Sequence, residues 1–254
     1  MSNKFIINAD DYGLTESCTK AIADAFKKGL ITSTTACANG QYLAEGLRLA
    51  KENGFADKIG VHINLTEGKP LTQKIATEPF FCENGIFHGK ISRLKKPNAK
   101  QLSALKEEVT AQIERLISLG YEISHADSHH HIHTCVYFIS TIKEILFAFG
   151  INKIRIHRNI GKIPFYKKIL KKWFNKKLKK HGFTVCPYFG SVEDYVAKKD
   201  LSAVCEVMVH PDYDVNGLLI DRVEQTENGN KGAQLETALA FTAGQEKISY
   251  RELK

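Results

Sequence analysis

The amino-acid sequence predicts an α/β protein with a mostly parallel, barrel-like sheet in a single domain. Six or seven short segments with strand character are each followed by a segment with helical periodicity, which is the order of βα units. Polar residues follow several of the strand-like segments directly, as they do where parallel strands carry an active site at their C-terminal ends. The 254 residues show no linker or internal repeat, so we expect one domain over residues 1–254.

Each predicted element has a local reason in the sequence. The strands are short apolar or β-branched runs, at residues 5–7, 31–37, 59–65, 124–133, 153–156, 184–186 and 204–209. The helices have apolar residues at intervals of three or four, over residues 15–29, 43–49, 101–119, 136–149, 165–180 and 232–241. Gly29 and Gly120 are the predicted stops of the first and third helices.

One long segment between predicted elements is not explained by this pattern. Residues 66–100 are rich in glycine and proline and lack a clear period. Connections of this length inside a compact domain are usually functional. We therefore expect a lid or a binding insertion there.

Histidines are concentrated in residues 124–133, which hold five of the ten in the chain. If this segment is a strand, five polar side chains share one face: His125, Asp127, His129, His131 and His133. Neighbours on that face lie roughly 6.5–7 Å apart, so only two or three can meet one ion. The mixture of histidine and aspartate predicts a metal or acid/base site rather than a chance histidine-rich loop.

Polar groups at the ends of four predicted strands suggest one shared site. Taken singly, each has an ordinary structural explanation, such as a helix N-cap, a hydrogen-bonded core histidine or a turn. Their occurrence at the same end of successive strands favours a divalent ion with open positions for water and substrate. The residues are Asp10 and Asp11, His62 with Asn64, Asp127 with His129 and His131, and His210.

The net charge of +8 comes from one region of the chain. Residues 145–192 contain twelve lysines or arginines and no acid, so the rest of the chain is slightly acidic. We interpret the lysine-rich helix within residues 162–180 as a solvated amphipathic face, with a polyanion or lipid-surface patch as the alternative. We expect no nucleic-acid partner and no membrane span. Six scattered cysteines without a paired motif indicate reduced thiols and a cytoplasmic location.

Four motifs follow one another along the chain: residues 8–13 (NADDYG), 60–66 (GVHINLT), 125–133 (HADSHHHIH) and 208–211 (MVHP). Together they resemble the YdjC-like carbohydrate deacetylases, which include the chitooligosaccharide (chitin disaccharide) deacetylases. The resemblance covers nearly the whole chain. It implies a distorted (β/α) TIM-like barrel, a homodimer, and a divalent metal, usually Mg²⁺. Ligand softness would equally suit Zn²⁺, Co²⁺ or Mn²⁺.

The resemblance also assigns roles to residues. It implies that Asp11, His62 and His129 hold the metal. Asp10 resembles the general base, and His210 resembles the group that assists the leaving amine.

Further residues are expected around this set. We expect Asp127 to orient a histidine, and His131 or Asn64 to contact substrate or support the site. Arg155 and Arg158 are candidates for binding sugar hydroxyls. The remaining histidines of the segment, His125, His130 and His133, are expected to be structural.

The predicted function is metal-dependent removal of the N-acetyl group from an amino sugar, most simply a small oligosaccharide such as diacetylchitobiose. No serine or cysteine nucleophile motif is present, and the histidines argue against a glycosidase with two opposed carboxylates. Two alternatives remain at this point. One is a metal phosphoesterase that uses the same ligands, and the other is a non-enzymatic protein that binds polyanions or lipid surfaces through its lysine-rich helix.

Overall fold

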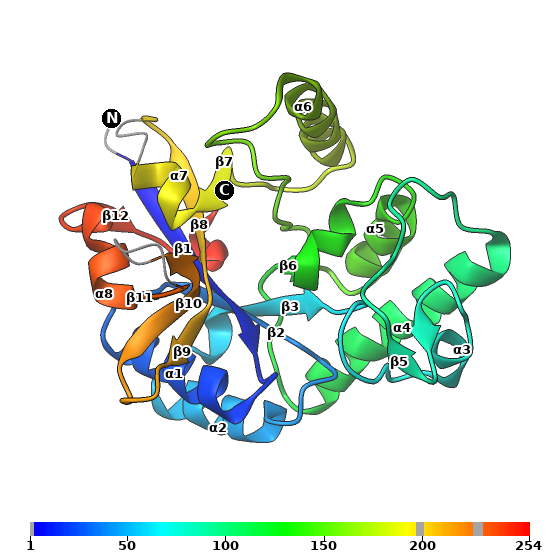
Figure 1. Ribbon diagram of the computed structural model, residues 1–254, viewed down its shortest axis with the longest axis horizontal. Helices are drawn as coiled ribbons and strands as arrows, with labels where there is room; N and C mark the ends of the chain where they lie inside the picture. The colour runs from blue at the N-terminus through cyan, green and yellow to red at the C-terminus, as the bar shows by residue number, and fades with distance from the viewer. Residues whose placement is uncertain (1–2, 197–200, 226–230) are drawn as a thin grey trace.

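A parallel sheet forms the centre of the computed structural model, which describes residues 3–196, 201–225 and 231–254 (Figure 1). Within these residues, six strands follow one another in the spatial order β6-β3-β2-β1-β8-β7, and the short strand β12 (Glu246–Lys247) adds to β1. The six are β1 (Lys4–Tyr12), β2 (Ser33–Ala36), β3 (Ile59–Ile63), β6 (Ala126–Ser128), β7 (Tyr188–Ser191) and β8 (Val204–Val209). All their pairings are parallel, so the chemistry-bearing ends of the strands point the same way.

Helices pack around the outside of the sheet, and α6 stands apart from the others (Figure 1). They are α1 (Glu16–Lys27), α2 (Leu43–Glu52), α3 (Gln73–Ala76), α4 (Ala99–Ser118), α5 (Ile139–Ala148), α6 (Phe165–Lys180), α7 (Val192–Val196) and α8 (Leu235–Ala238). Two small antiparallel sheets complete the fold: β4 (Cys82–Glu83) with β5 (Ile86–Phe87), and β9 (Pro211–Tyr213) with β10 (Leu219–Gln225) and β11 (Lys231–Gln234). Short 3₁₀ turns lie at Ala56–Lys58, His129–Thr134, Ala240–Thr242 and Tyr250–Glu252.

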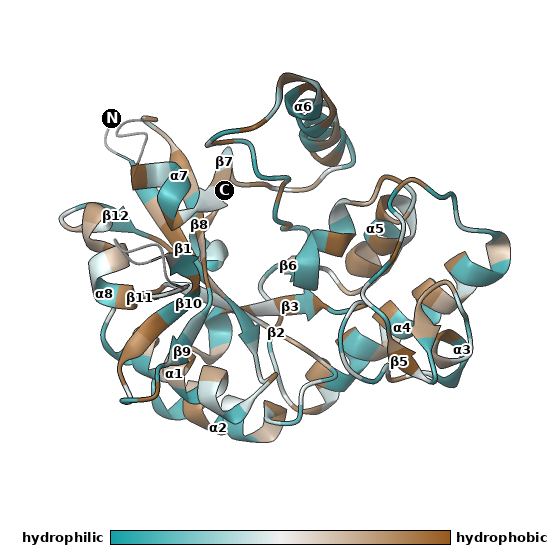
Figure 2. Cartoon of the chain, in the orientation of Figure 1, coloured by the Kyte–Doolittle hydropathy of each residue, from teal (hydrophilic) through white to brown (hydrophobic). Residues whose placement is uncertain are grey.

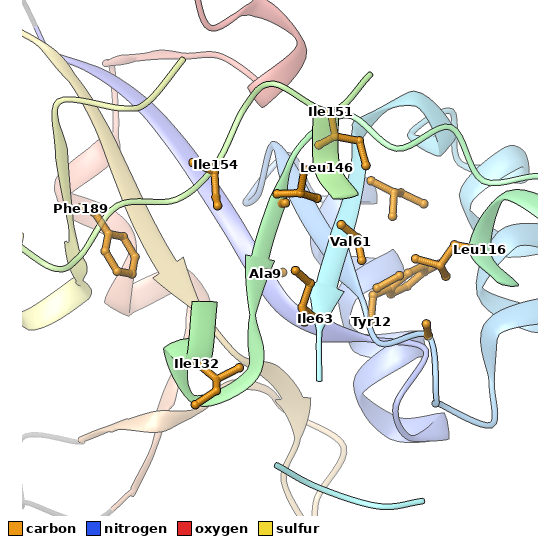
Figure 3. Close-up of a cluster of buried hydrophobic side chains, with 14 of the residues drawn as sticks. Ala9, Tyr12, Val61, Ile63, Leu116, Ile132, Leu146, Ile151, Ile154 and Phe189 are labelled. Carbon is orange, nitrogen blue, oxygen red and sulfur yellow. The ribbon is translucent and has the colours of Figure 1, made fainter. Parts of the chain in front are cut away.

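The core lies between the central strands and the covering helices. Val61 and Ile63 of β3 and Tyr12 of β1 are fully buried in it, together with Leu116 of α4 and Leu146 of α5 (Figure 3). Because the strands are buried on both faces, polar side chains on them need hydrogen-bond partners among other buried polar groups. The site described below is made of such groups.

Local sequence signals set the limits of α4. Asn98 caps its N-terminus by accepting a hydrogen bond from Gln101 N at 2.9 Å, and the Gln101 side-chain oxygen accepts one from Asn98 N. After the last residue, Gly120 adopts a φ of +95°, which ends the helix. The helix predicted over residues 101–119 is therefore confirmed, with its start moved to the residue after the cap.

Gly60 lets β3 lie close to the histidine segment. A Cβ at this position would fall 2.6 Å from both the Nδ1 atom and the carbonyl oxygen of His125. No larger residue fits without moving the neighbouring strand. This close approach places His62, two residues further along β3, opposite Asp127 of β6.

The expected α/β fold with a mostly parallel sheet is confirmed, but the sheet forms a half-barrel, so the TIM-like barrel does not close. Between β6 and β7 the described chain has only isolated bridges, from Ala126 to Ile154 and from Lys153 to Thr184. The strands predicted at 153–156 and 184–186 are therefore reduced to single pairings. Pro187 offers no N–H to a ladder, and the strand resumes only after it, as β7.

The histidine segment is also not the long strand that was predicted. Strand β6 ends at Ser128, and the chain then turns through the 3₁₀ segment His129–Thr134. His130 and His131 have φ values of 50° and 53°, which no strand can accommodate. The five side chains predicted to share one face therefore point in different directions.

The helix predicted over residues 232–241 is replaced by β11, the short helix α8 and a 3₁₀ turn. Gly232 has a φ of +98°, which is incompatible with an α-helical start. None of the helices in the described parts of the chain is long and apolar enough to cross a bilayer.

Candidate active site

A cavity of about 590 Å³ opens at the C-terminal ends of the parallel strands. Polar residues from four separate strand ends line it or lie directly beneath it, as the sequence predicts. Asp10 and Asp11 come from β1, His62 from β3, His129 and His131 from the turn after β6, and His210 from the residue after β8.

Asp11 lies between two imidazoles. Its Oδ1 atom is 2.8 Å from His129 Nδ1 and 3.2 Å from His62 Nε2. Burial would raise the pKa of this carboxyl, but hydrogen bonds from the two histidines lower it well below its usual value. Asp11 is thus held as a carboxylate, in a left-handed backbone conformation with a φ of 73° that aspartate seldom adopts.

His62 is fixed from behind by Asp127. The distance from His62 Nδ1 to Asp127 Oδ1 is 2.6 Å, which leaves Nε2 directed at Asp11. Burial opposes the charged imidazolium, but Asp127 and Asp11 outweigh it and raise the pKa of His62 to about 10. The contact with Asp127 thus holds the His62 ring in one orientation.

Asp10 is held by a buried arginine. Arg155 donates from Nη1 and Nη2 to the two Asp10 carboxylate oxygens, each at 2.7 Å. The same guanidinium contacts Asp127 Oδ2 at 2.7 Å and Glu206 Oε1 at 2.6 Å. Although burial raises the pKa of Asp10, Arg155 lowers it below the usual range, so Asp10 is ionised.

The expectation that Arg155 binds sugar is corrected by this geometry. Its side chain has no exposed surface, and three carboxylates use its guanidinium donors beneath the site. Arg158, the other predicted sugar-binding arginine, lies outside the catalytic cavity. It pairs with Asp194 at 2.6 Å and lines a neighbouring cavity of about 290 Å³.

His131 and His210 complete the wall of the cavity. The Nδ1 atom of His131 is buried with no hydrogen-bond partner among the described residues, and the ring packs edge-on against Phe189. Burial lowers the pKa of His131 to about 3, so this imidazole is neutral. A buried nitrogen of this kind is uncommon in folded proteins, and the residue that carries it lines the cavity.

Asn64 supports the site indirectly. Its Oδ1 atom accepts hydrogen bonds from the backbone N–H groups of Thr66 and Glu67, at 3.0 and 3.1 Å. This turn presents Glu67 to the cavity, where its Oε2 atom is 2.8 Å from His129 Nε2.

The other three histidines have partners in the fold, although His130 also lines the catalytic cavity. His125 stacks on Tyr250, with ring centroids 3.8 Å apart, and its Nε2 meets Asn8 Oδ1. His133 bonds to Ser128 and to the backbone oxygen of Arg155, while His130 meets Thr66 Oγ1 at 3.0 Å. His125 and His133 are thus buried with partners on every side, whereas the structural role of His130 stays a prediction.

Sequence reasoning missed several residues of the site. Glu67 lies two residues after the end of a predicted strand and could have been found by the same strand-end argument that identified His62. Arg222 of β10 forms an ion pair with Asp11, and Glu206 of β8 shares Arg155 with Asp10. For these two there is no local signal, because each meets its partner only through the tertiary fold.

The donor atoms fit a divalent cation. Among the residues that the structure describes, three groups of possible ligands have atoms within 4.8 Å of one another: Asp11, Cys37 and His62; Glu67, His129 and His130; and Asp10, His62 and Asp127. His129 falls in a different group from Asp11 and His62, although its Nδ1 touches Asp11. Carboxylate and imidazole donors around one ionised aspartate suit borderline cations such as Zn²⁺, Co²⁺ or Mn²⁺.

A parallel α/β sheet with carboxylates and imidazoles at its C-terminal edge is the arrangement of many metal-assisted hydrolases. The chain belongs to the YdjC-like protein family, whose family model matches residues 4–246.

Relatives agree with this assignment, and a solved structure shares the fold. The chain is 30% identical over 211 residues to carbohydrate deacetylase 1 of Listeria innocua, covering 83% of this chain and 82% of the relative. It is 37% identical over 142 residues to a carbohydrate deacetylase of Vibrio campbellii, covering 56% and 55%. The fold matches a putative cellobiose-phosphate cleavage protein of Enterococcus faecalis with a TM-score of 0.74 at 22% identity, covering 100% and 99% of the two chains.

Proposed function

We propose that this protein hydrolyses the N-acetyl group of an amino sugar and releases acetate, using a divalent metal ion. The observation that carries the proposal is the pairing of two ionised aspartates: Asp11 between His62 and His129, and Asp10 on Arg155. Similarity to proteins named carbohydrate deacetylases supports an amide as the bond that is cleaved and a sugar as the substrate class.

In this proposal Asp11, His62 and His129 hold the metal. The chemistry supplied by a bound divalent ion is polarisation of the amide carbonyl and activation of water. Mg²⁺ is the cation that the family resemblance implies, whereas two imidazoles beside one carboxylate favour Zn²⁺, Co²⁺ or Mn²⁺.

The chain's own residues divide the proton transfers between them. Asp10 is ionised and borders the cavity, so its carboxylate can accept a proton from the attacking water. His210, which also borders the cavity, donates a proton to the departing amine. His131, which also lines the cavity, contacts a polar group of the substrate in this proposal.

The substrate in this proposal is a small oligosaccharide such as diacetylchitobiose. A cavity of about 590 Å³ lies within the range of roughly 300–1,000 Å³ that is usual for small-ligand sites. Residues 66–100 act as a binding insertion, because Glu67 at their start reaches the wall of the cavity at His129. The chain acts as one domain, and a homodimer remains its predicted oligomeric state.

Product analysis distinguishes this function from a phosphoesterase on the same ligands. Protein loaded in turn with Mg²⁺, Mn²⁺, Co²⁺ and Zn²⁺ is incubated with diacetylchitobiose and, separately, with chromogenic phosphate esters. We expect acetate from the disaccharide and no phosphate from the esters. Release of phosphate, with no acetate from any N-acetylated sugar by protein with bound metal, would assign the phosphoesterase instead.

A further inference from the structure

The helix α6 carries a set of large apolar side chains that nothing in the described chain covers. Five of them are more than half exposed, although ordinary surface helices keep such residues for the core. They are Phe165 (78% exposed), Tyr166 (63%), Ile169 (55%), Leu170 (64%) and Trp173 (53%). At intervals of four they lie along one side of the first two turns and a half, which we call the apolar stripe.

Lysines border the apolar stripe on both sides and continue beyond it. The helix contains eight lysines, and residues 145–192, which include α6, contain no aspartate or glutamate. Figure 2 shows α6 as mostly hydrophilic with hydrophobic residues interspersed, on a helix that projects from the body of the protein. The solvated-face interpretation accounts for the lysines but not for five exposed aromatic and aliphatic side chains.

A different side of α6 attaches it to the protein. Phe174 and Leu178 are buried, and the Asn175 side chain bonds to the backbone N–H and C=O of His157 at 2.9 and 3.0 Å. These contacts fix the orientation of the helix. The apolar stripe is therefore held away from the core and does not pack against it.

The charge of α6 restricts what can cover the stripe. A second copy would bring another eight lysines against the first set, with no acid on either helix to offset them. A nucleic acid would satisfy the lysines but offers no apolar phase for Phe165, Ile169 and Leu170. An anionic bilayer surface satisfies both, because apolar and aromatic side chains enter the acyl boundary while lysines remain at the phosphates.

We propose that α6 docks the protein onto an anionic lipid surface, with the apolar stripe inserted in the interface. A neighbouring cavity connects this helix with the catalytic cavity through shared lining residues. Lys171 lines the cavity of about 290 Å³ together with His131 and Met208, and these two residues also line the catalytic cavity. Docking through α6 thus places the approach to the catalytic cavity close to the lipid surface.

Trp173 can serve as a fluorescence probe of lipid binding, because it is the only tryptophan of the chain and lies in the apolar stripe. Tryptophan emission of the full chain is recorded during titration with phosphatidylglycerol-containing vesicles and with pure phosphatidylcholine vesicles. We expect a blue shift and quenching by bromolipids with the anionic vesicles, and binding that weakens as salt is raised. Vesicle co-sedimentation measures the same binding independently.

Variants on the surface of α6 test the two parts of the proposal separately. Ile169→Ser with Leu170→Ser removes two apolar contacts, and Lys172→Glu with Lys176→Glu reverses two charges. Each pair is expected to weaken binding to anionic vesicles by roughly tenfold or more. Val215→Ser, at a fully exposed position on another surface, should leave binding unchanged.

Three results would overturn the proposal. One is an unshifted emission spectrum with anionic vesicles, and another is equal binding to neutral vesicles. The third is a blue shift in the absence of lipid. If it appears as the protein concentration rises, the stripe mediates self-association; if it appears on addition of an oligonucleotide, the stripe binds nucleic acid.

Discussion

Replacing Arg155 with methionine is expected to lower the free energy of unfolding by about 3–5 kcal/mol. The variant removes the one guanidinium that Asp10, Asp127 and Glu206 share, and none of these carboxylates is exposed enough for water to compensate. Methionine keeps much of the side-chain volume, so the loss reports the uncompensated charges rather than a cavity. Urea unfolding followed by circular dichroism measures the change.

Arg48 provides the matched control. It also contacts two carboxylates, Glu45 and Glu52, but on the exposed surface of α2. Arg48→Met is expected to change stability far less, because water replaces the lost contacts. Equal losses in the two variants would contradict the account of Arg155 as the residue that holds the carboxylates together.

The replacement His210→Asn is expected to lower kcat for acetate release by about 10²- to 10⁴-fold, the usual contribution of a positioned acid or base. His210 borders the cavity but belongs to none of the three ligand groups found in the described chain. Metal affinity and the free energy of unfolding should therefore remain unchanged. Acetate assays, metal titration calorimetry and urea unfolding on the same preparation measure the three quantities.

A matched histidine outside the site serves as the control. His181 follows α6 and does not line the catalytic cavity, so His181→Asn should retain full kcat. Loss of metal binding in His210→Asn would contradict its role as a proton donor and make it a ligand. Unchanged kcat would remove it from the reaction altogether.

Much of the site follows from one rule of parallel sheets. Asp10, Asp11, His62 and His210 were predicted to converge because each lies at or near the C-terminal end of an apolar strand, and the structure brings them to one cavity. The rule uses only local sequence, since strand direction is common to the whole sheet. The amphipathic helix over residues 165–180 was likewise predicted from its period, and its bounds are confirmed.

The remaining features depend on contacts that no local pattern encodes. The pairing of Arg155 with Asp10 joins residues 145 positions apart, so the sequence suggested a sugar-binding arginine where the structure has a buried support. The turn at His130 and His131 was missed because left-handed conformations at non-glycine residues leave no periodic signal. Closure of the barrel was overestimated because single bridges and full strands have the same β-branched composition.

The most direct test of the account is acetate release from diacetylchitobiose by chelator-treated protein, measured before and after a divalent metal is restored. The account predicts negligible release from the stripped protein, recovery on addition of metal, and no recovery in Asp11→Asn. Folding of the variant is checked by circular dichroism. Full activity after chelation, or recovery in Asp11→Asn equal to that of the wild type, would contradict the proposed metal-dependent hydrolysis at Asp11, His62 and His129.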